Sequence, residues 1–205
     1  FTNPHIPDRT MALARDGGDV FVAAIRQSIA ELARMDTSII AIPCHTAHAR
    51  FADIACGAPV PIVSIVALTT QAVIARVGAR ARVALFATEG TMRSGIYQRC
   101  APTMDWIVPS RSDQRSMSHI IAETKAGRRV PAREVDVLVA RAVAHGAEAV
   151  VLACTELSLY AMDITTTCVI IDPLLVLADA LVAHGVDGGT PVARACGTAV
   201  HACAR

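Results

Sequence analysis

Short apolar runs alternate along the chain with longer segments in which apolar residues recur at helical spacing. The runs predict strands at residues 37–43, 62–66, 82–87, 106–109, 149–153 and 168–171. The longer segments predict helices at residues 12–35, from about 46, at 69–77, after a turn at 88–91 through 97, and at 112–124, 131–145 and 174–184. Alternating strands and helices are typical of parallel βαβ units. We therefore expect an α/β protein, and assign no fold to the small-residue tail from 188.

The composition agrees with this fold class. Hydrophobic residues make up 53% of the 205 positions but aromatic residues only 3%, so Ala, Val, Ile and Leu must build the core. Such a core suits parallel strands covered by helices on both faces. The net charge of +1 gives no reason to expect nucleic acid or an anionic membrane as a partner. No apolar run reaches the roughly 20 residues that a membrane span needs.

The seven cysteines include no CxxC pair, so the sequence gives little support for a zinc or thioredoxin-type site, and we expect no metal. Their number is odd, and a chain of this size does not need disulfide bonds for stability. Free thiols in a reducing cytoplasm are therefore favoured. Two of them stand out by their position. Cys44 and Cys154 each follow a predicted strand and precede a predicted helix, and Thr46 and Thr155 come shortly after them.

A side chain in that position lies at the carboxyl edge of a parallel sheet, where α/β proteins keep their ligand sites. Two such edges that face each other would hold one thiol on either side of a small substrate, as a two-base proton transfer requires. The alternative interpretation is that Cys44 and Cys154 are small buried hydrophobic residues. The other five cysteines are expected to be structural.

Four motifs carry a family resemblance. They lie at residues 3–10 (NPHIPDRT), 42–48 (IPCHTAH), 88–92 (TEGTM) and 152–157 (LACTEL). In this order and with this spacing they resemble the aspartate/glutamate racemase family, whose members work without pyridoxal phosphate. The similarity extends from Asn3 to about Ala178.

The resemblance implies two similar α/β lobes, each a mainly parallel sheet flanked by helices, with the active site in the cleft between them and usually a homodimer. Residues 1–59 and 174–205 would form the first lobe and residues 60–173 the second. Family members also carry a strand, a glycine-rich turn and a helix ahead of the Asn-Pro loop. These elements have no counterpart in this sequence.

The resemblance further implies an isomerase that racemises aspartate, glutamate or a related amino acid without a cofactor. Cys44 and Cys154 would be the acid/base pair. Arg9 matches a position that pairs with the side-chain carboxylate of an acidic substrate, and Lys125 falls near a basic residue that the family uses. A solvated loop arginine and a helix-terminal cation are the respective alternatives.

Four further residues complete the expected site. Thr46, Thr91 and Thr155 would offer hydroxyls and amides to the α-carboxylate, with helix capping as their competing role. His45 stands where the family usually has asparagine. It could act as a cation for a carboxylate, lower the pKa of Cys44, or block the usual pose of the substrate. Glu156 could act on Cys154 as a neighbouring carboxylate, or it could cap its own helix.

Two other functions remain open from the sequence. One is a different isomerase of the wider superfamily, of the hydantoin racemase or maleate isomerase type. The other is a catalytically silent carboxylate-binding homologue, which the missing amino-terminal elements and His45 motivate.

Overall fold

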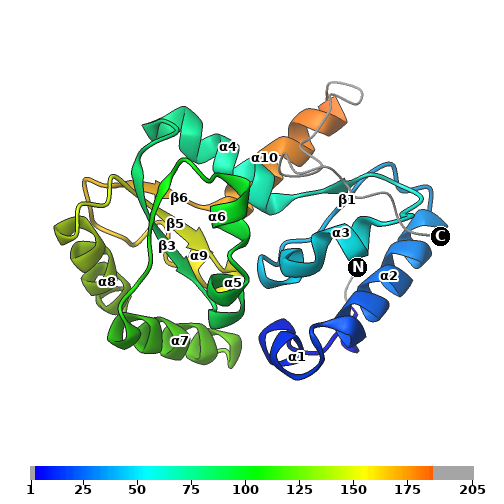
Figure 1. The fold of residues 1–205 in the computed structure, drawn as a ribbon, viewed down its shortest axis with the longest axis horizontal. Coiled ribbons are helices and arrows are strands. Elements are labelled where there is room, and N and C mark those ends of the chain that lie inside the picture. The colour runs from blue at the N-terminus through cyan, green and yellow to red at the C-terminus, as the bar shows by residue number, and fades with distance from the viewer. Residues whose placement is uncertain (1–2, 187–205) are drawn as a thin grey trace.

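The computed structural model describes residues 3–186, which form two lobes (Figure 1). The chain begins with α1 (Arg9–Asp16), α2 (Asp19–Ala33), β1 (Ile40–Ala41), the 3₁₀ helix η1 (Thr46–Arg50), α3 (Phe51–Ala55) and β2 (Ile62–Val63). It continues with α4 (Ile65–Val77), β3 (Arg82–Ala87), α5 (Glu89–Ser94), α6 (Ile96–Cys100), β4 (Asp105–Ile107), α7 (Arg111–Lys125), α8 (Ala132–Ala144), β5 (Ala149–Ala153), α9 (Thr155–Ser158), β6 (Val169–Ile171) and α10 (Pro173–Val186).

The larger lobe is built on a four-stranded parallel sheet in the order β4-β3-β5-β6. Successive residues of a strand point to opposite faces, and β3 shows this directly. Leu85 packs in the core shared with α4, α6 and α10, whereas Phe86 packs in the core shared with α7 and α8. Figure 1 shows these helices on opposite sides of the sheet. The expected two-lobed α/β fold with parallel strands is therefore confirmed.

The smaller lobe has a two-stranded parallel sheet, in which Ile40 pairs with Ile62. Its core is a separate cluster that α2 supplies with Phe21, Ile25 and Ile29. Ile54 of α3 belongs to the same cluster.

The predicted single helix at residues 12–35 is wrong, because two glycines divide it. Gly17 and Gly18 both have positive φ, at 67° and 92°, a conformation that glycine adopts without the steric cost of a Cβ. Asp16 fixes the break, because its carboxylate accepts a hydrogen bond from the Gly18 N–H at 2.9 Å. The chain turns between the two helices, and α1 packs against α5 of the larger lobe as well as against α2.

The predicted strand at residues 62–66 is too long. Ser64 caps α4 by accepting a hydrogen bond from the Ala67 N–H at 3.2 Å, so the helix already begins at Ile65. The turn predicted at residues 88–91 and the single helix predicted after it, through Tyr97, are also wrong. Helix α5 already begins at Glu89, and Gly95, with a φ of 61°, separates it from α6. By contrast, the strands predicted at 82–87 and 149–153 match β3 and β5.

The contacts of β2 and α10 bear on the predicted division at residues 59 and 174. β2 pairs with β1 of the smaller lobe. Helix α10 packs on α4 and on the larger sheet. The division between the lobes stays a prediction, and residues 187–205 of its first lobe lie outside the described part of the chain.

Within residues 3–186, no helix combines the length and the apolar character needed to cross a bilayer.

Candidate active site

A small cavity of about 80 Å³ lies where the two lobes meet. One wall comes from the start of α1 and from the turn that joins β1 to η1. The other comes from the ends of β3, α7 and β5. Its lining residues are Asp8, Arg9, Thr10, Pro43, Cys44, His45, Thr46, Thr88, Lys125, Ala153, Cys154, Thr155 and Glu156. Seven of the eight residues expected from the sequence therefore line one cavity, and the eighth, Thr91, lies behind its wall.

The two cysteines occupy equivalent turns. The Cys44 N–H donates to the Ile42 carbonyl, and the Cys154 N–H donates to the Leu152 carbonyl, both at 2.8 Å. Each tight turn directs the chain from a strand into a short helix, η1 after Cys44 and α9 after Cys154. Because parallel strands deliver both turns at their carboxyl ends, one thiol reaches the cavity from each lobe.

His48 holds the turn of Cys44 in place. Its Nδ1 lies 2.9 Å from the Cys44 carbonyl, and the Ile65 N–H donates to its Nε2 at 3.3 Å. An N–H needs an acceptor, so Nε2 is unprotonated in the neutral ring and Nδ1 donates to Cys44. His48 is 5% exposed and stacks on Phe51. Burial lowers its pKa to about 4, so the ring stays neutral at physiological pH.

Cys154 is the more buried of the two thiols, at 6% exposure, while Cys44 is half-buried. The Cys154 thiol donates a hydrogen bond to Oε2 of Glu156 at 2.8 Å. Burial raises the pKa of Cys154 well above its ordinary range, and the negative charge of Glu156 raises it further. Lys125 acts in the opposite direction.

His45 lines the cavity, but its ring is directed into the protein. Its Nδ1 lies 2.8 Å from the Tyr97 hydroxyl, and the residue is 3% exposed. Burial, with a smaller effect from His48, lowers the pKa of His45 to about 3. The ring is therefore neutral near pH 7, which does not favour the cationic role considered from the sequence.

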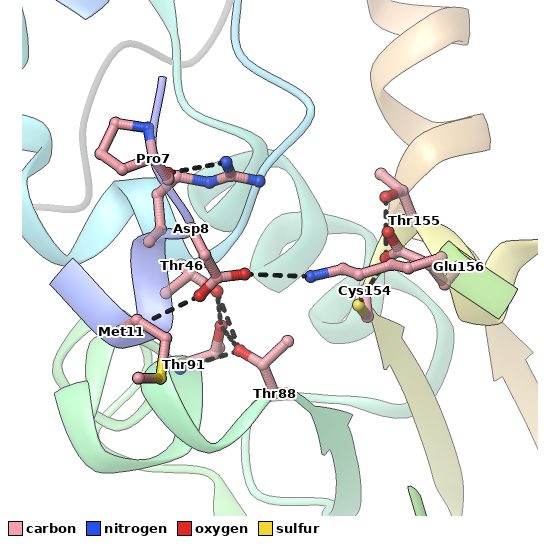
Figure 2. Close-up of polar contacts among 11 residues, drawn as sticks. Pro7, Asp8, Met11, Thr46, Thr88, Thr91, Cys154, Thr155 and Glu156 are labelled. Atoms are coloured by element: carbon pink, nitrogen blue, oxygen red, sulfur yellow. Dashed lines mark hydrogen bonds and ion pairs between the residues drawn. The ribbon is translucent and has the colours of Figure 1, made fainter. Parts of the chain in front are cut away.

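Three threonines form a hydrogen-bonded cluster across the junction of the lobes. Thr46 lies 2.8 Å from Thr88 and 3.0 Å from Thr91 between hydroxyl oxygens. Thr88 also caps α5 by accepting from the Thr91 N–H at 3.2 Å. Figure 2 shows this cluster facing Cys154 and Glu156. Thr91 is 1% exposed, so it can influence the cavity only through its two partners.

Cations reach the cavity from both lobes. Arg9 donates from Nη1 to the Pro7 carbonyl at 2.9 Å and makes none of the ion pairs found among residues 3–186. Lys125 pairs with Asp8 at 3.4 Å, which joins the end of α7 to the start of α1 (Figure 2). Asp8 caps α1 through the Met11 N–H, and its pKa lies below the usual range: burial opposes the shift, but the Met11 N–H and the charges of Lys125 and Arg9 outweigh it.

Sequence reasoning missed three polar lining residues, Asp8, Thr10 and Thr88, and left Glu156 without a firm role. All four are adjacent to, or two or three positions from, residues that it did select. The signal that could have found Asp8 and Thr88 is their N-cap position, which places a side chain at a helix start. Within the described residues, no group of three or more His, Cys, Asp or Glu side chains could hold a metal ion.

The chain is similar to known proteins over most of its length. The profile of the Asp/Glu/Hydantoin racemase family matches residues 1–181. The aspartate racemase of Picrophilus torridus is 25% identical, with a TM-score of 0.74 over 93% of this chain and 79% of that one. An aspartate racemase homologue from Pyrococcus horikoshii is 21% identical, with a TM-score of 0.70 over 88% and 81% of the two chains. A glutamate racemase from Campylobacter jejuni is 12% identical, with a TM-score of 0.60 over 98% and 80%.

The fold and the matched residues define an α/β isomerase of the racemase type. The chain belongs to the Asp/Glu/Hydantoin racemase family.

Proposed function

We propose that this protein is a cofactor-independent racemase of aspartate, glutamate or a related amino acid, with Cys44 and Cys154 as its two bases. One observation carries the proposal: two thiols from equivalent turns of different lobes line the same small cavity. Cations and hydroxyls line that cavity too, so an amino acid with two carboxylates has partners there for both of them.

The chemistry follows from the position of the thiols. Racemisation breaks the α-C–H bond on one face of the substrate and forms a new one on the other. One cysteine, as a thiolate, takes the α-proton and becomes a thiol. The other cysteine gives its proton to the opposite face of the carbanion and becomes a thiolate. The roles exchange for the opposite enantiomer, so neither base has to move around the substrate.

Arg9 and Lys125 supply recognition of an acidic side chain. A guanidinium can hold a carboxylate through two parallel hydrogen bonds, and an ammonium adds a second positive charge. The backbone N–H groups of Thr46 and Thr155, two residues that line the cavity, would receive the α-carboxylate. These donors also stabilise the charge that develops when the α-proton leaves. The cations favour aspartate or glutamate over a hydantoin, which has no carboxylate to pair with them.

The test is racemisation followed by circular dichroism, starting from each enantiomer of aspartate and of glutamate. Cys44→Ser and Cys154→Ser should each lower the rate about 100-fold or more, because a hydroxyl ionises far less readily than a thiol. Cys168→Ser is the matched control, since Cys168 is a free, half-buried thiol outside the cavity. Full activity of either cavity variant would refute the two-thiol proposal.

A homodimer and a cytoplasmic location remain predictions of the family resemblance and the composition. Analytical ultracentrifugation of the purified protein tests the first, with a monomer at micromolar concentration as the contrary result.

A further inference from the structure

The two thiols of the cavity differ in their hydrogen bonds. Cys154 donates to Glu156 at 2.8 Å, whereas no hydrogen bond to the Cys44 sulfur is found within residues 3–186. We propose that Glu156 is a positioning residue that keeps the proton on Cys154, so that in the resting enzyme Cys154 is the acid and Cys44 supplies the base. This inference rests on the two-thiol function proposed above.

The carboxylate of Glu156 is fixed beside the sulfur by a second donor. The Thr155 hydroxyl donates to Oε2 at 3.1 Å, the same oxygen that accepts from Cys154. Figure 2 shows the three side chains together at the start of α9. A protonated thiol satisfies this oxygen. A thiolate in the same place would set two negative charges against each other in a half-buried site, so the arrangement favours the protonated form.

The other charged groups around Cys154 do not cancel this preference. Lys125 approaches from α7, but its ammonium also pairs with Asp8 at 3.4 Å. Arg9 lines the far wall and donates to Pro7. Asp172, at the end of β6, accepts from the Ser158 hydroxyl at 2.6 Å and does not line the cavity. Glu156 is therefore the charged group in direct contact with the thiol.

The resting arrangement sets the order of proton transfers. An enantiomer whose α-proton faces Cys44 meets the resting form: Cys44 takes that proton, and the Cys154 thiol gives its own proton to the opposite face. The product leaves a Cys44 thiol and a Cys154 thiolate beside Glu156. One proton then returns to Cys154 from water and one leaves Cys44, so the proton count of the enzyme is unchanged over the cycle.

Comparing the two enantiomers by kcat/KM cannot reveal this order, since enantiomers have equal free energy and the two values must be equal. The proton on each sulfur must be measured directly. Iodoacetamide alkylates thiolates, and mass spectrometry of the digested protein gives a rate for each cysteine at each pH. The pH at half-maximal rate reports ionisation, whereas the maximal rate reports access, so the burial of Cys154 does not confuse the result.

In the wild-type protein, Cys44 should be alkylated at a lower pH than Cys154. Glu156→Gln keeps the shape of the side chain and removes its charge, so it should move the Cys154 profile to lower pH by about one unit or more and leave Cys44 in place. Glu134→Gln is the matched control, because Glu134 also lies in the first turn of a helix but far from the cavity. The high-pH limb of kcat/KM should shift with the Cys154 profile.

Two results would overturn the inference: alkylation of Cys154 before Cys44 in the wild type, or a Cys154 profile that Glu156→Gln leaves unmoved. The first result is measured on the wild-type protein, so the inference can be refuted even if Glu156→Gln does not fold. The alkylation profiles also need no substrate. A protein with the expected profiles and no racemisation would contradict the proposed function alone, and an active racemase with the reverse order would contradict this inference alone.

Discussion

Acidification below pH 6.5 should destabilise this protein through two buried histidines of the first cysteine motif. His45 and His48 are 3% and 5% exposed, and burial lowers their pKa values to about 3 and about 4. An unfolded chain returns each ring to its ordinary pKa of about 6.5. Below that pH the unfolded state therefore binds two protons that the folded state does not, and the free energy of unfolding falls as the pH falls.

The size of the effect follows from the two pKa values. Each histidine contributes about 1.4 kcal/mol per pH unit between its unfolded and folded pKa values. At pH 5 this amounts to about 2 kcal/mol for each ring relative to neutral pH, and about 4 kcal/mol for the pair. The loss continues down to the folded values, near pH 4 for His48 and near pH 3 for His45. The window from pH 6.5 to 5 lies above the main titration range of carboxylates, so the histidines dominate it.

Urea denaturation at several pH values in this window measures the slope directly. We expect about 2.7 kcal/mol per pH unit for the wild type. His45→Asn should remove about half of that slope, because one titrating ring is lost and His48 remains. His119→Asn is the control, since His119 lies exposed on α7. A stability that stays constant from pH 6.5 to 5, or a slope that His45→Asn does not change, would refute the reasoning.

Two further substitutions test the geometry of the cavity. Gly90→Ala would place a Cβ 2.7 Å from Oγ1 and 3.0 Å from Cα of Thr10, so overpacking should cost about 1–3 kcal/mol in urea denaturation, whereas Gly185→Ala, with open space around it, should not destabilise. Arg9→Gln should raise KM for aspartate and glutamate about 10-fold or more, because a charge-assisted hydrogen bond is lost. An equal loss with an uncharged amino acid would count against a role of Arg9 in reading the side chain.

The sequence predicted best those residues whose structure depends mainly on their neighbours along the chain. The strands at 82–87 and 149–153 are continuous apolar runs with turns on both sides, so their limits could be read directly. Cys44 and Cys154 could be paired because each ends such a run. The break between α1 and α2 was missed because the apolar spacing continues across Gly17 and Gly18, and only their positive φ reveals the turn.

Other features depend on contacts between distant segments, which no local pattern shows. The link from His48 to Ile65 joins residues 17 positions apart, and the bond from His45 to Tyr97 joins residues 52 positions apart. The sequence could offer His45 as a cation near the substrate, but not show that its ring would be buried against Tyr97. The difference between the two thiols likewise became visible only when the Glu156 carboxylate was found beside Cys154.

The most direct test of the account is the position of solvent deuterium during the first turnovers in D₂O. With L-aspartate or L-glutamate as substrate, two thiols on opposite faces predict that the D-enantiomer formed carries deuterium at Cα while the unreacted L-enantiomer keeps its proton. Proton NMR after chiral separation measures both. A single base would carry some of the original proton into the product and introduce deuterium into the recovered substrate, and that outcome would contradict the roles given to Cys44 and Cys154.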